Sequence, residues 1–159
     1  MVCEKCIQNP FFHHFLSMGN TEEGYAIYYS KFSLNMEKEF REESIPQYLA
    51  HMDAASQSKW IWIFDSCGLE HMPMPNPLVV KKFFKLLQDR YKHSLLKIFI
   101  FDVNWKVSFL LSLVQPFMTK ETRHRIQECK SPLELVSAKI PPLIFRELCS
   151  RLTGGANHS

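Results

Sequence analysis

Two short apolar runs on either side of one amphipathic segment constrain the fold most. Trp60–Phe64 reads Trp-Ile-Trp-Ile-Phe and Leu96–Phe101 reads Leu-Lys-Ile-Phe-Ile-Phe, and their length, β-branching and aromatic content favour buried strands. Leu78–Lys92, between them, carries an apolar stripe at helical spacing. A strand, a helix and a second strand form a βαβ unit, whose strands pair in parallel through a right-handed crossover. The sequence therefore predicts an α/β fold with a mostly parallel sheet and βαβ crossovers.

Local patterns predict further elements around this unit. We expect residues 1–23 to be a short lead with one helical turn around Phe11–Met18, 24–155 to form one domain, and 156–159 to be a polar tail. Periodicity and capping residues predict two further strands and four further helices. The strands are Gly24–Ser33 and Arg125–Glu128, and the helices are Ser44–Gln57, Trp105–Phe117, Ser131–Ser137 and Pro141–Arg151.

Composition supports a single packed core in a reducing compartment. The chain is 46% hydrophobic and holds 13 Phe and 3 Trp, which is too much apolar area for a disordered chain. Its longest uncharged apolar run, Val107–Thr119, is shorter than the roughly 20 residues that span a bilayer. Five cysteines form no disulfide framework, and Met1–Gln8 lacks the apolar core of a signal peptide. We therefore expect a cytoplasmic protein.

Charge is unevenly distributed along the chain. Residues 1–80 hold 5 Lys and Arg against 10 Asp and Glu, whereas residues 81–159 hold 14 against 6. A basic half can face an anionic partner such as phospholipid, although the net charge of +3 does not suggest a dedicated nucleic-acid binder. The alternative is that the fold intermixes the two halves.

The segment Trp105–Phe117 is apolar on nearly all sides. Such a helix is either buried all round or faces an apolar partner. A basic cluster follows it directly, with cations at Lys120, Arg123 and Arg125. One interpretation is a solvated basic face, and the other is contact with an anionic membrane surface.

Metal and catalytic motifs are weak. Cys3-x-x-Cys6 with His13 and His14 offers four zinc ligands, but adjacent histidines rarely bind one ion together, so we predict no metal site and no cofactor.

Asp65 and Asp102 each follow a predicted buried strand, where α/β active sites lie. They are an acid–base pair or, as we favour, caps of the following turns. Because no nucleophile or phosphate-binding motif accompanies them, we do not predict an enzyme.

Several motifs resemble those of the CRAL-TRIO lipid-binding domain. Lys97–Ile126 looks like the strand and gate helix of that family, with Pro116-Phe117 closing the helix and Thr122-Arg123 in the next turn. Other matching positions are Asp65-Ser66-Cys67-Gly68, Gln88-Asp89-Arg90-Tyr91 and Gly154-Gly155. The chain departs from the family at Asp102-Val103-Asn104, where Asn-x-Pro is common, and before the last Gly-Gly. Residues 1–23 also hold no counterpart of the helical N-terminal subdomain of the transfer proteins.

The resemblance implies non-enzymatic binding of a phospholipid or other hydrophobic ligand under the gate helix, with exchange at membranes. We expect helices on one face of the sheet and the gate helix over the other. Lys120, Arg123 and Arg125 would contact the membrane or a headgroup, which makes the protein transiently peripheral. The expected ligand-binding residues of the sheet and gate are Ile61, Ile63, Phe99, Phe101, Phe109, Leu110, Leu113, Val114 and Phe117.

The alternative implied by the resemblance is a pocket-poor protein-interaction scaffold, with small GTPases or their regulators as partners. The two hypotheses differ in whether the core beneath the gate helix is filled. A filled core predicts that Leu110→Trp destabilises the fold by about 1–3 kcal/mol through overpacking.

Overall fold

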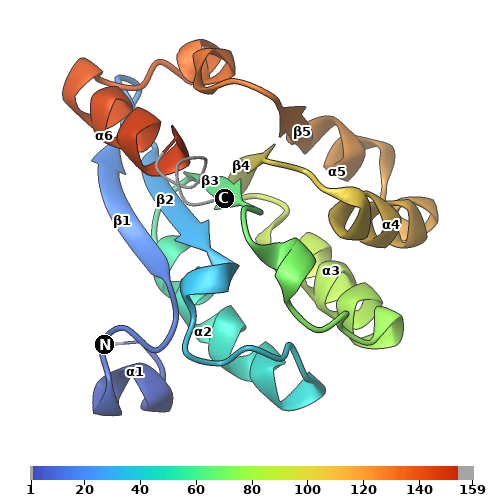
Figure 1. The fold of residues 1–159 in the computed structure, drawn as a ribbon. Helices are drawn as coiled ribbons and strands as arrows, with labels where there is room; N and C mark the ends of the chain where they lie inside the picture. The colour runs from blue at the N-terminus through green and yellow to red at the C-terminus, as the bar shows by residue number, and fades with distance from the viewer. Residues whose placement is uncertain (1, 154–159) are drawn as a thin grey trace.

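A five-stranded sheet organises the domain in the computed structural model, which describes residues 2–153 (Figure 1). The strands lie in chain order, with β1 antiparallel to β2 and the other neighbours parallel. The predicted α/β fold and its parallel βαβ unit are confirmed. The strands are β1 (Phe15–Asn20), β2 (Ala26–Lys31), β3 (Trp60–Asp65), β4 (Leu95–Phe101) and β5 (Ile126–Cys129).

Helices connect the strands and begin at residues suited to capping. Asn76 accepts a hydrogen bond from the Leu78 amide before Pro77, and Asn104 and Thr119 cap the next two helices in the same way. The α-helices are α1 (Glu4–Gln8), α2 (Ile45–Ala55), α3 (Pro77–Tyr91), α4 (Trp105–Val114), α5 (Lys120–Arg125) and α6 (Pro142–Thr153). The 3₁₀ turns are η1 (Phe32–Leu34), η2 (Glu42–Ser44), η3 (Leu69–His71), η4 (Gln115–Phe117) and η5 (Pro132–Ala138).

Alternate residues of the central strands point to opposite faces and build two cores. One core packs the sheet against α2, α3 and α4, and the other packs it against α6 and η5 (Figure 1). The strand residues of the first core include Trp60, Trp62, Ile98 and Ile100. Those of the second core include Ile27, Tyr29, Ile61, Ile63, Phe99 and Phe101.

The expectation that the gate helix covers the opposite face from the other helices was wrong. Val107 and Leu111 of α4 pack in the same core as residues of α2 and α3. Right-handed crossovers explain this placement, because β2 to β5 run in chain order and each crossover moves the same way across the sheet. The connecting helices therefore lie on one face, and α6 covers the other.

The expected helical turn around 11–18 is also absent, since Phe15–Asn20 forms β1. Phe15 stacks on Tyr28 of the neighbouring strand, with ring centroids 5.0 Å apart. The register shifts between Ser17 and Gly19, whose φ of 116° favours glycine. Part of the predicted lead is thus an edge strand of the sheet, whereas Gly154-Gly155 and the predicted tail lie outside the described residues.

The fold brings the acidic and basic halves of the sequence together. Lys82 pairs with Glu42, Arg90 with Asp53 at 2.5 Å, and Lys139 with Glu23 at 3.1 Å. Each pair joins one residue of 1–80 to one of 81–159, so the two halves intermix at these places. Within residues 2–153, no helix has both the length and the hydropathy to cross a bilayer.

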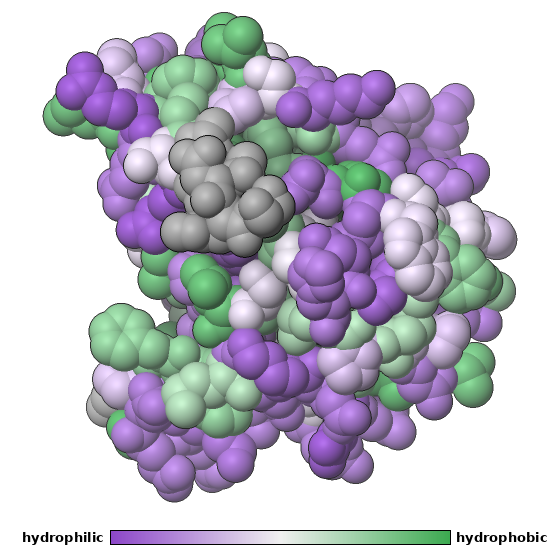
Figure 2. Space-filling view, viewed as in Figure 1, coloured by the Kyte–Doolittle hydropathy of each residue, from purple (hydrophilic) through white to green (hydrophobic). Residues whose placement is uncertain are grey.

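Polar side chains cover most of the face seen in Figure 1. Hydrophobic side chains lie among them in small groups, some of them on the right-hand side of the view, where α4 lies (Figure 2).

Candidate functional site

An apolar cavity of about 180 Å³ lies between the sheet and the helices α2, α3 and α4. Its floor is the face of β3 and β4 that carries Trp62, Phe64, Ile98 and Ile100. Apolar side chains of the three helices and of the loop after β3 form its walls. These include Met52 of α2, Val80, Phe83 and Phe84 of α3, Val107, Leu110 and Leu111 of α4, and Leu69, Met72, Pro73 and Pro75 of the loop.

Several polar groups near the floor are already paired. Trp62 donates its indole N–H to the Ser30 hydroxyl at 2.8 Å, which leaves the ring as an apolar surface. Asn35 donates to the Tyr48 hydroxyl at 2.6 Å and accepts the amide of His14, also at 2.6 Å. Groups satisfied in this way leave few polar contacts for a ligand, so the cavity suits an apolar one.

Helix α4 forms the wall of the cavity next to the Pro-rich loop. Lys106 at its start donates from Nζ to the carbonyl oxygens of Glu70 at 2.8 Å and Met72 at 2.7 Å. Asn104, which caps the helix, also donates to the Glu70 carboxylate at 3.2 Å. These contacts hold the start of α4 and the loop as one unit at the carboxyl ends of the parallel strands.

The outer side of α4, continued by η4, carries a row of exposed apolar residues spaced by four. Trp105, Phe109, Leu113 and Phe117 are exposed by 66%, 45%, 36% and 56%, respectively. Lys81 of α3 lies 3.5 Å from the centre of the Phe117 ring, which places a cation over its face. The helix thus has one side toward the cavity and one apolar side toward solvent, and we call these four residues the outer row.

The structure separates the expected ligand-binding residues into four groups. Leu110 lines the cavity, whereas Val114 is buried beside Val80 and Met118. The gate residues Phe109, Leu113 and Phe117 belong to the outer row. The four sheet residues pack on the opposite face, against α6 and η5, and do not line the cavity: Ile61, Ile63, Phe99 and Phe101.

The three expected headgroup residues also differ in their surroundings. Lys120 and Arg123 are exposed. Arg125 is engaged within the domain, because its guanidinium donates to the Lys92 carbonyl at 2.5 Å and to the Glu121 carboxylate at 2.6 Å. Of the three, Lys120 and Arg123 present their charge to solvent.

The two carboxylates considered as an acid–base pair lie in different environments. Asp65 is buried and accepts hydrogen bonds from the Tyr29 hydroxyl at 2.7 Å and the Cys67 amide at 3.0 Å. Asp102 is exposed, and its φ of 58° places it in the left-handed region. The hydrogen bond to Cys67 agrees with the favoured capping role of Asp65. Gly68 completes this turn, since its φ is 92° and a Cβ there would lie 2.7 Å from Ser33 Cβ.

The buried Asp65 predicts a characteristic pH dependence of stability. Burial raises the pKa of its carboxyl above the ordinary value of 3.8, so the folded state favours the protonated form. The stability that Asp65 contributes is therefore greatest below pH 3.8 and is lost as the pH rises through its folded pKa. In denaturant titrations at a series of pH values, we expect the unfolding free energy of the wild type minus that of Asp65→Asn to decrease as the pH rises from 3.8 through the folded pKa of Asp65. A difference that stays constant or grows would contradict this assignment.

A separate cluster of possible metal ligands lies at the N-terminal end of the domain. Cys3, Cys6, His13 and His51 bring their ligating atoms within 4.8 Å of one another. From the sequence, His14 was grouped with the first three and no metal was expected. In the structure His14 instead accepts the Lys31 amide at 3.0 Å, and His51 of α2 takes the fourth place.

The sheet order, the crossovers and the apolar cavity define an α/β domain with helices on both faces of its sheet and an apolar cavity on one of them. A comparison with protein-family models matches residues 13–144 to the CRAL/TRIO domain. The chain belongs to this family, whose members are typically non-enzymatic and bind lipids or other hydrophobic ligands.

The crystal structure of Sfh5 has a similar fold. The two share 13% sequence identity at a TM-score of 0.60, over 87% of this chain and 53% of the other. The chain thus spans about half the length of that protein. A search of curated protein sequences finds no significant match.

Proposed function

We propose that this domain binds the apolar part of a lipid in the cavity beneath α4 and exchanges it at membranes. The observation that carries this proposal is the apolar cavity of about 180 Å³ under a helix whose other side is also apolar. Each methylene that enters such a cavity contributes about 0.8 kcal/mol. A few methylenes are therefore enough for measurable affinity.

The size of the cavity indicates how a ligand enters. At about 180 Å³ it is smaller than the roughly 300–1,000 Å³ of typical small-molecule sites. It accommodates part of an acyl chain, and a longer one requires α4 to move outward. Such a movement exposes Val107, Leu110 and Leu111, and a membrane surface is where this exposure costs least.

The proposed membrane contact is the outer row of α4 together with the neighbouring cations. Apolar side chains enter the headgroup boundary, while Lys120 and Arg123 face anionic lipid at about 1 kcal/mol each. The protein would then be cytoplasmic and only transiently peripheral, with no chemical step.

One observation favours the alternative of a protein-interaction scaffold. The cavity is small, and the outer row is a ready apolar surface for a protein partner. A scaffold would use the outer row without taking up lipid, so lipid transfer separates the two functions.

Replacing Leu113 by glutamate tests the membrane contact. We expect Leu113→Glu to weaken binding to anionic vesicles about 10- to 100-fold, since inserting a leucine is worth about 1.5–3 kcal/mol. Vesicle sedimentation measures binding, and transfer of a labelled lipid between vesicles measures exchange. Leu143→Glu is the matched control, because Leu143 is 78% exposed on α6, at the opposite face of the sheet. Equal effects of both substitutions, or no transfer by the wild type, would contradict the proposal.

A further inference from the structure

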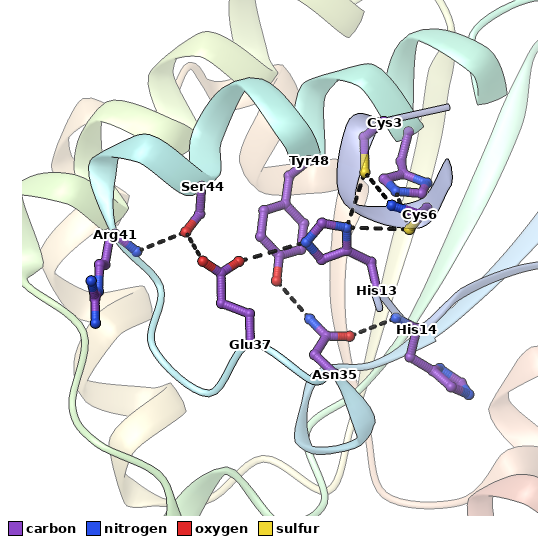
Figure 3. A network of polar contacts seen from close by, with 10 residues as sticks. Cys3, Cys6, His13, His14, Asn35, Glu37, Arg41, Ser44 and Tyr48 are labelled. Carbon is purple, nitrogen blue, oxygen red and sulfur yellow. Dashed lines mark hydrogen bonds and ion pairs between the residues drawn. The ribbon is translucent and has the colours of Figure 1, made fainter. Parts of the chain in front are cut away.

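Four metal-ligating side chains from separate parts of the chain meet at the N-terminal end of the domain. Cys3 and Cys6 come from α1 and its N-cap, His13 precedes β1, and His51 lies on α2. Figure 3 shows the imidazole of His13 pointing toward the two thiols. Two Cys and two His are the donor set of many structural zinc sites.

Three of the six distances between the ligating atoms match the edges of a zinc tetrahedron. Zn–S bonds of about 2.3 Å and Zn–N bonds of about 2.0–2.1 Å place neighbouring ligand atoms about 3.4–3.8 Å apart. His13 Nδ1 lies 3.4 Å from Cys3 Sγ and 3.6 Å from Cys6 Sγ. His51 Nε2 lies 3.5 Å from Cys6 Sγ, and all pairs lie within 4.8 Å. Only a small inward movement is needed to surround one ion.

The surroundings of the four side chains are those of a built site. Cys3, His13 and His51 are more than nine-tenths buried. The second nitrogen of His13, Nε2, lies 3.6 Å from a carboxylate oxygen of Glu37, and both atoms are buried without a hydrogen bond. Glu37 is itself held by the Ser44 hydroxyl at 3.0 Å. A carboxylate behind a ligating histidine orients the ring and raises its basicity.

A metal-free hydrogen-bonded network is the other arrangement open to the cluster. Hydrogen bonds among neutral thiols and imidazoles would also direct the Nε2–H of His13 at the Glu37 carboxylate, so the metal content of the purified chain distinguishes the two arrangements. For a bound cation, a tetrahedral set of two sulfurs and two nitrogens selects zinc.

We propose that Cys3, Cys6, His13 and His51 bind one structural zinc ion, through both thiolates, His13 Nδ1 and His51 Nε2. The ion would fasten the N-terminal segment to α2. His51 also lines the cavity, and Tyr48 and Met52 of the same helix do so as well. Zinc would thereby fix one wall of the cavity, a role that does not depend on which ligand the cavity holds.

Metal analysis of the full chain, purified after expression with added zinc, tests this proposal. We expect on the order of one zinc per folded chain, falling at least tenfold in Cys6→Ser and in His51→Gln. Cys67→Ser and His14→Asn are the matched controls and keep their zinc. The asparagine in His14→Asn can still accept the hydrogen bond from the Lys31 amide. His14 is adjacent to His13 in the sequence but is not one of the four clustered ligands, so its loss should not affect zinc. Zinc lost equally from the controls, or retained by the ligand variants, would overturn the site.

Two measurements on the wild type keep the test independent of how the variants fold. X-ray absorption at the zinc edge should show two sulfurs at about 2.3 Å and two nitrogens at about 2.0–2.1 Å. Zinc at about 100 times its Kd should raise the thermal midpoint of the metal-free protein by about 5–10 °C. A folded chain without zinc, a shell of oxygen ligands, or a Cys3–Cys6 disulfide would show that no such site exists.

Discussion

Replacing Leu110 by tryptophan is expected to weaken binding of a fluorescent acyl probe about 50-fold. Leu110 lines the cavity from α4, and an indole at this position occupies space that the ligand would use. Excluding about three methylenes costs roughly 2.4 kcal/mol, which corresponds to that loss of affinity. Because the indole enters a cavity and not a filled core, we expect the free energy of unfolding to change by less than about 1 kcal/mol.

The matched control is Leu113→Trp, the same substitution less than one helical turn further along α4. Leu113 belongs to the outer row and does not line the cavity, so probe affinity should stay within about twofold. Equilibrium titration with the probe measures the affinity of each variant, and denaturant unfolding measures its free energy of unfolding. If Leu110→Trp cost about 1–3 kcal/mol of stability, with no probe binding in the wild type, the filled-core scaffold would be correct.

The second large effect is expected at the cavity floor. Trp62→Ala should lower the free energy of unfolding by about 3–5 kcal/mol, as is usual for truncating a buried tryptophan. Trp62 is 7% exposed, and it contacts the rings of Phe15, Trp60 and Phe64 at centroid distances of 6.2, 6.2 and 5.5 Å. The substitution also removes the donor to Ser30, whose hydroxyl is buried.

Trp105→Ala is the control for this prediction, because it removes the same side chain from an exposed position. Trp105 is 66% exposed at the start of α4, and we expect a change within about 0.5 kcal/mol. Both variants can be compared by urea unfolding at equal protein concentration. Similar losses in the two variants would mean that the face of β3 toward α2, α3 and α4 does not form the core described above.

Hydrophobic periodicity was sufficient to predict the central part of the fold. Trp60–Phe64 and Leu96–Phe101 are short, bulky and almost uncharged, so a parallel pair joined by the intervening helix was the expected arrangement. The N-terminal edge strand was missed because Phe15–Asn20 is short and contains a glycine at a bulge. Its pairing is set by contacts with β2, such as Phe15 on Tyr28, which local sequence does not reveal.

The face of the sheet that carries the cavity was harder to predict than the sheet itself. In a buried parallel strand both faces are apolar, so alternation does not distinguish Ile61 and Ile63 from Trp62 and Phe64. The right-handed crossover rule, applied to strands in chain order, is the signal that would have placed α4 on the same face as α3. Wall residues such as Tyr48 and Phe83 depend on helix packing and had no separate sequence signal.

The metal cluster was predictable only in part. Cys3, Cys6 and His13 are close in sequence, and the spacing of the two cysteines drew attention to them. The fourth ligand, His51, lies 38 positions after His13 in the sequence and reaches the cluster only because α2 packs beside β1. The available sequence signal was the position of His51 between Leu49 and Met52, two residues of the predicted apolar stripe of this helix. In the structure all three side chains are buried.

Native mass spectrometry of the full chain, purified without added lipid or detergent, tests the central claim most directly. We predict a folded protein with a co-purified hydrophobic ligand, lost in Leu110→Trp and retained in Leu113→Trp. Extraction and fragmentation of the released ligand should identify one or more acyl chains. A wild-type protein that is consistently free of ligand, and that takes up none from vesicles, would contradict lipid binding in the cavity beneath α4.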